Sequence, residues 1–95
     1  MRVIFAANLI HADFSRTGVF ATKNVEIAVL PCTGMEVESK GLGAGSRRVL
    51  DVTVNIDGKG YDAYINLSDI MCPSEPEFNE TIQNFKDNGW EINGQ

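Results

Sequence analysis

Two runs in which apolar and polar residues alternate, VLDVTVNI at 49–56 and YDAYINL at 61–67, are separated by a short glycine-containing segment. This pattern predicts an antiparallel β-hairpin. A two-residue turn at Gly58-Lys59 and a four-residue loop at 57–60 give the same register. The predicted pairs are Ile56–Tyr61, Val54–Ala63, Val52–Ile65 and Leu50–Leu67. One face of the hairpin is then apolar and the other polar, as in an antiparallel sheet with one face in water.

Other segments repeat the two-residue period of a strand. Residues 3–10 have apolar side chains on both faces, which predicts a buried strand, and residues 19–30 alternate except where Lys23 interrupts the apolar face. Pro31 to Gly34 break the pattern, because proline cannot donate to a ladder. It resumes at 35–38, with Met35 and Val37 expected to face inward. A short strand at 90–92 and a frayed tail at 93–95 are expected at the end.

The period changes after Pro73. Ser74 and Glu77 form a capping-box pattern, and Pro76 suits the first turn of a helix. The apolar positions that follow share one helical face; they are Phe78, Ile82 and Phe85. Asn88-Gly89 is a typical helix end. We therefore expect one short helix that packs on the apolar face of the sheet.

These elements predict an α+β fold. We expect a largely antiparallel meander sheet of five to six strands, covered by one C-terminal helix, with a small curled barrel as the alternative. The 95 residues suffice for a single domain spanning 1–95.

The charge is distributed unevenly along the chain. The net charge is −5, and nine of the 13 acidic residues lie in residues 49–95. Binding to nucleic acid depends on clustered Lys and Arg, so we expect no nucleic-acid partner. The acidity serves either ordinary solubility or a basic protein partner. No segment has the roughly 20 apolar residues of a membrane span, and we expect a soluble cytoplasmic protein with no membrane partner.

Few residues offer catalytic or metal chemistry. Cys32 and Cys72 are expected at opposite ends of the sheet as free thiols. His11 lies two residues before Asp13, which is too little for a metal site, and we expect a surface histidine there. Glu36 and Glu38 are expected on a solvated strand face. We therefore predict no catalytic residues, no metal and no cofactor.

One glycine-rich segment, KGLGAGSRR at 40–48, is a candidate anion site. Backbone N–H groups freed by glycine could surround an anion, with basic side chains beside them. The candidate residues are Lys40, Gly41, Gly43, Gly45, Arg47 and Arg48. The segment lacks the following helix that completes phosphate-binding motifs, so a simple connection between strands is the alternative.

The polar face of the hairpin is a candidate surface for a protein partner. Its residues are Asp51, Thr53, Asn55, Asp62, Tyr64 and Asn66. Tyrosine among short polar side chains suits adaptable contacts. We expect a non-catalytic protein-interaction module, with homo-oligomerisation as a variant. The alternative is a protein that binds a small molecule or an anion, in the sheet–helix cleft or at 40–48. An enzyme is the third hypothesis, and it requires His11, a cysteine and a carboxylate close together.

Overall fold

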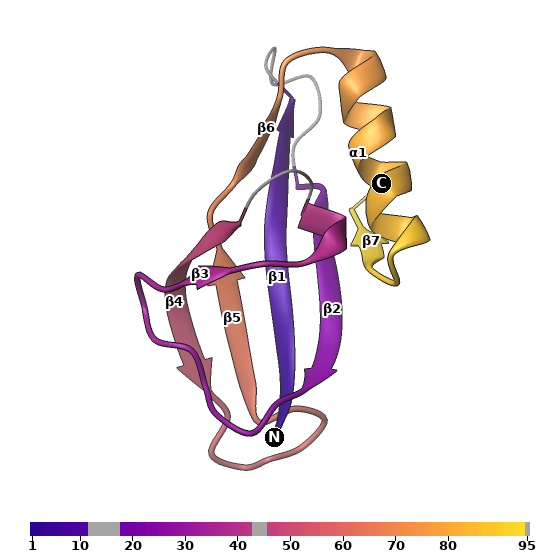
Figure 1. The fold of residues 1–95 in the computed structure, drawn as a ribbon. Helices are drawn as coiled ribbons and strands as arrows, with labels where there is room; N and C mark the ends of the chain where they lie inside the picture. Colours follow the sequence, from indigo (N-terminus) through magenta and orange to yellow (C-terminus); the bar gives the residue numbers. More distant parts are fainter. Residues whose placement is uncertain (12–17, 43–45, 95) are drawn as a thin grey trace.

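The computed structural model describes residues 1–11, 18–42 and 46–94. In chain order the elements are β1 (Arg2–His11), β2 (Phe20–Glu26), β3 (Glu36–Val37), the 3-10 helix η1 (Lys40–Leu42), β4 (Arg47–Val54), β5 (Ala63–Leu67), β6 (Ile70–Cys72), α1 (Glu75–Asp87) and β7 (Glu91–Asn93). The strands form one mixed sheet that curls into a half-barrel beside α1 (Figure 1). The predicted α+β class is confirmed.

The predicted meander is only partly correct, because β1 lies in the middle of the sheet. The strand order is β3-β4-β5-β1-β2-β7, and most neighbours are antiparallel. However, β1 runs parallel to β5 and, further along, to β6. At the start of the parallel pair, Asp62 N donates to Arg2 O and Arg2 N donates to the Asp62 carboxylate, each at 2.8 Å. On one face of β1 the residues Val3, Phe5, Ala7 and Leu9 are buried, whereas on the other face Ile4 and Ile10 are half-buried.

The hairpin β4–β5 keeps half of its predicted register. The pairs Val54–Ala63 and Val52–Ile65 are confirmed, but Val49 takes the predicted place of Leu50 opposite Leu67. The register shifts between Val49 and Asp51, which is a β-bulge. The bulge turns Val49 into the core and leaves Leu50 49% exposed.

The connection of the hairpin is longer than the predicted turn. Residues 55–62 form an irregular loop, and the predicted pair Ile56–Tyr61 is wrong. Asn55 organises this loop, because its side-chain amide donates to the carbonyls of Lys59 and Tyr61 at 3.2 and 2.9 Å. Positive φ angles at Gly58 (66°) and Gly60 (83°) let the chain fold back. Ile56 is consequently 93% exposed.

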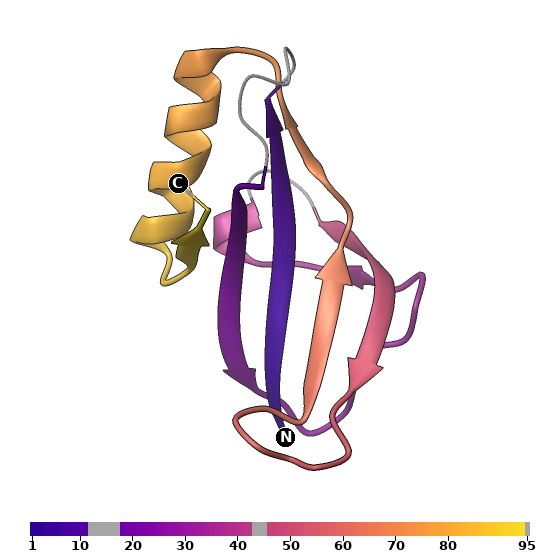
Figure 2. The same ribbon diagram turned by 180° about the vertical axis from the view of Figure 1, so that it is seen from behind.

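The C-terminal helix agrees with its prediction. Ser74 is the N-cap and accepts a hydrogen bond from Glu77 N, while Phe78, Ile82 and Phe85 are buried. The helix covers only one end of the sheet, beside β7, as the two views show (Figures 1 and 2). Ile27, Leu30 and Val37, from the segment that links β2 to η1, pack against the rest of the core. The inner face is thus covered by a helix and by an irregular segment, and not by the helix alone.

Two strand boundaries differ from the sequence pattern. β2 ends at Glu26, although the alternation continues to Leu30; the last backbone hydrogen bond on this side runs from Ile27 N to Met1 O, at 3.0 Å. Met35 is exposed and does not face inward; its Sδ lies 3.1 Å from Cys32 N. At the other end, Asn93, which we expected in the tail, is the last residue of β7 and pairs with Phe20. Gln95 lies outside the described residues.

Candidate functional site

The glycine-rich segment begins as part of the core. Lys40 and Gly41 belong to η1, in which Gly41 and Leu42 are buried. A Cβ atom at Gly41 would lie 2.5 Å from Nε1 of Trp90, so any larger residue here would have to displace the indole ring. Trp90 Nε1 in turn donates to Ser39 Oγ at 3.4 Å. The candidate residues Gly43 and Gly45 lie outside the described residues.

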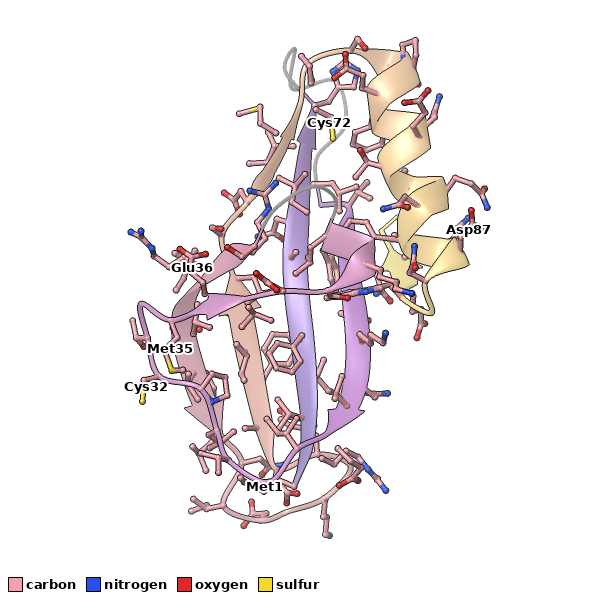
Figure 3. All side chains as sticks on the ribbon, in the orientation of Figure 1. Met1, Cys32, Met35, Glu36, Cys72 and Asp87 are labelled. Atoms are coloured by element: carbon pink, nitrogen blue, oxygen red, sulfur yellow. The ribbon has the colours of Figure 1, made fainter. Side chains whose placement is uncertain are left out.

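The two arginines of this segment open β4. Arg47 and Arg48 lie opposite Val37 and Glu36 of β3. Nε of Arg48 lies 3.6 Å from Oε1 of Glu36, whose other carboxylate oxygen accepts a hydrogen bond from Ser46 Oγ at 2.8 Å. Figure 3 shows Glu36 at this edge of the sheet. The acidic partner offsets the charge of Arg48, which weakens the case for an anion at this place.

The predicted polar face is the outer face of the half-barrel. Thr53 lies opposite Tyr64, and Asp51 lies opposite Asn66. The Asn66 amide donates to Asp51 Oδ1 at 2.9 Å. The ring of Tyr64 packs edge-on against Tyr61, with centroids 6.3 Å apart. Four of the six predicted face residues therefore form two adjacent cross-strand pairs.

The other two predicted residues have structural partners near the loop 55–62. Asn55 holds that loop, and one carboxylate oxygen of Asp62 accepts the Arg2 N–H. Both side chains are half-buried. These hydrogen bonds give both side chains a structural role at the end of the outer face that adjoins the loop 55–62.

An exposed apolar corner adjoins this face, and the sequence analysis missed it. Met35, Leu50, Val54 and Ile56 are 51%, 49%, 58% and 93% exposed. Leu50 and Val54 lie on β4 and Ile56 is two residues beyond its end, while the backbone of Met35 bonds to Val49. We call these four residues the apolar corner. The alternation of apolar and polar residues did not reveal this surface, because it assigned Leu50, Val54 and Ile56 to the core.

The backbone edge of β4 is open beside the apolar corner. Asn55 N donates to Asp62 O, and hydrogen-bonded pairs alternate along an antiparallel ladder. The N–H and C=O groups of Val52 and Val54 therefore point away from β5. Within the described chain, β3 pairs only with Arg47 and Arg48, so no strand lies along this part of the edge.

The third hypothesis required His11, a cysteine and a carboxylate, and the structure brings such residues to one end of the sheet. His11 pairs with Cys72 in register, and its Nε2 lies 3.1 Å from Oε2 of Glu75. The expectation of a surface histidine is wrong, since His11 is 5% exposed and packs on Phe78. Cys72 is equally buried, and its thiol lies 3.8 Å from Thr81 Oγ1. A buried thiol in this setting suits packing better than nucleophilic attack.

Both cysteines are free, as predicted. Cys32 is exposed at the β4 edge, whereas Cys72 lies near the helix N-terminus at the far end of the molecule (Figure 3). Within the ranges 1–11, 18–42 and 46–94, no three His, Cys, Asp or Glu side chains gather in a group that could hold a metal ion. Over the same residues, no helix is long and apolar enough to cross a membrane.

Comparison of the chain with protein-family models, with characterised proteins and with solved structures finds no match.

Proposed function

We propose that this protein is a small, non-catalytic interaction module that binds a protein partner along the outer edge of β4. The observation that carries the proposal is the apolar corner beside an open stretch of backbone. Exposed apolar side chains that gather in one place mark interaction surfaces more often than chance. An open strand edge offers backbone groups to which an extended segment of another protein can pair.

The chemistry of the corner suggests what the partner presents. An extended segment paired with Val52 and Val54 would place alternate side chains beside these two valines, on the side of the sheet that Ala63 and Ile65 share. Its other side chains would face the outer surface, where Asp51 lies. The proposed partner is therefore an extended segment with alternating apolar and basic residues. A second copy of this chain is the variant of the same proposal.

The proposal places the protein in the cytoplasm, the compartment in which free thiols such as Cys32 and Cys72 stay reduced. The acidic C-terminal half supports a basic partner by electrostatic attraction, which raises association rates and weakens with salt.

A charge introduced at the apolar corner tests the proposal. Tagged wild-type protein and the variant Val54→Lys are used to capture proteins from the native host, and light scattering on each preparation measures self-association. Val54→Lys is expected to abolish capture or self-association, because a lysine ammonium loses hydration in a buried interface.

Met71→Lys provides the matched control. Met71 is as exposed as Val54, at 58%, but lies on β6 at the other end of the sheet. The proposal predicts that at least one protein is captured by wild type and by Met71→Lys but is not captured by Val54→Lys. Capture that is equal for both variants, or lost in both, contradicts it.

A further inference from the structure

A pocket lies between the inner face of the half-barrel and the segment that leads into η1. Its volume is about 350 Å³, which is within the range of small-molecule sites. Most of its lining is apolar and comes from β1, β2, β3, the residue after β2 and the residue before β7; these residues are Phe5, Val25, Ile27, Val37 and Trp90. Lys23, Glu38 and Ser39 complete the lining.

Lys23 is the unusual member of this lining. It lies opposite Phe5 in the β1–β2 ladder and shares the inner face with Ala21 and Val25. A charged side chain on an apolar face is costly unless it is paired. Its ammonium donates to Asn88 O, at the end of α1, at 3.1 Å. An ammonium group has three donors, so this bond leaves two of them for another acceptor.

The described residues give Lys23 no acidic partner. Glu38 lines the same pocket but is exposed, and no ion pair between it and Lys23 occurs among the residues that the structure describes. The pocket therefore combines apolar walls with one half-buried cation that retains hydrogen-bonding capacity. This combination suits a ligand with an apolar body and a single acid group.

We propose that this pocket binds a small amphipathic anion, with its acid group at Lys23 and a compact aromatic or branched body between Val25 and Trp90. The site is separate from the β4 edge, so it adds to the proposed function and does not depend on it. Lys23 supplies the selectivity for an anion, and the apolar walls supply most of the burial.

Two fluorescent probes with one aromatic body test the proposal. Anilinonaphthalene sulfonate carries an acid group, and phenylnaphthylamine has the same rings without it. Wild type is expected to bind both, the sulfonate more tightly. Lys23→Met should lower the affinity for the sulfonate by about tenfold, since a hydrogen bond to a charged group contributes that much. The affinity for phenylnaphthylamine should not change. Lys23→Arg should bind the sulfonate about as tightly as wild type does, because the cation is kept.

Two kinds of control locate the binding. Lys59→Met removes a cation from the loop 55–62 and should change neither affinity. Val25→Trp should block both probes by filling the pocket, and Val37→Phe serves if the first variant fails to fold by circular dichroism. The proposal is overturned if wild type binds neither probe, if Lys23→Met weakens both probes equally or neither, or if the filled variants bind as wild type does.

Discussion

Leu50 shows how one residue changes what a strand presents. In an unbroken ladder Leu50 faces the core opposite Leu67, but the bulge gives that place to Val49. The extra residue is held because Val49 N donates to Met35 O and Gly34 N donates to Val49 O, both at 2.8 Å. These bonds tie β4 to the segment that precedes β3. A strand pattern cannot reveal them, because their partners lie some 15 residues away in the sequence.

At the same scale, the two thiols should differ sharply in reactivity. With a disulfide reagent such as dithionitrobenzoate, Cys32 is expected to react within the mixing time, since it is exposed. Cys72 should react only as fast as the protein unfolds, because it is buried beside the N-terminus of α1.

The variant Cys32→Ser isolates the second thiol and provides the measurement. Reaction of Cys72 in the folded protein at the rate of Cys32 would show an accessible thiolate beside His11. That result would revive the hypothesis of an enzyme and would count against a purely structural role for this end of the sheet.

At the scale of elements, local signals predicted the helix and most strands but not how they pack. The cap at Ser74 and the spacing of Phe78, Ile82 and Phe85 depend only on neighbours within the helix, and they are confirmed. The position of η1 against Trp90 depends on segments some 50 residues apart. In the sequence, Gly41 therefore resembled part of an anion-binding loop. In the structure, it lies against the Trp90 side chain, where a larger residue would clash.

The contact between η1 and Trp90 predicts the effect of a methyl group at Gly41. Gly41→Ala should destabilise the protein by about 1–3 kcal/mol, because the indole must shift to make room. Urea unfolding measures the change. Trp90→Phe provides the matched test, since a smaller ring relieves the clash and the two effects should then be less than additive.

Full additivity of the two substitutions would contradict the contact. A neutral effect of Gly41→Ala on stability, together with a loss of anion binding, would instead favour the anion site at residues 40–48.

At the scale of the whole molecule, the strand order was the least predictable feature. Neighbouring strands such as β1 and β2 or β4 and β5 pair as their sequence order indicates. The insertion of β1 between β2 and β5 joins residues some 60 positions apart, such as Arg2 and Asp62. Four of the six residues predicted on the polar face form cross-strand pairs there. The apolar corner was not predicted, because it depends on the bulge in β4 and on the loop 55–62. The pocket was not predicted, because part of its lining comes from the covering segment at 27–39.

In the described part of the chain, two stretches of strand edge differ in character, one on β2 and one on β4. The edge of β2 beyond β7 carries Asn24 and Glu26, and a charged edge resists pairing with another chain. The edge of β4 carries Val52 and Val54 and adjoins the apolar corner. We therefore expect a partner to pair with β4 and not with β2, although both edges have backbone N–H and C=O groups without a strand partner.

Amide hydrogen exchange, followed by NMR in the free protein and in the complex with the captured partner, tests this choice most directly. In the free protein the N–H groups of Val52 and Val54 should exchange faster than that of Thr53, which faces β5. In the complex, Val52 and Val54 should become protected while Asn24 and Glu26 stay as they were. Protection that appears at Asn24 and Glu26, with Val52 and Val54 unchanged, would contradict the account.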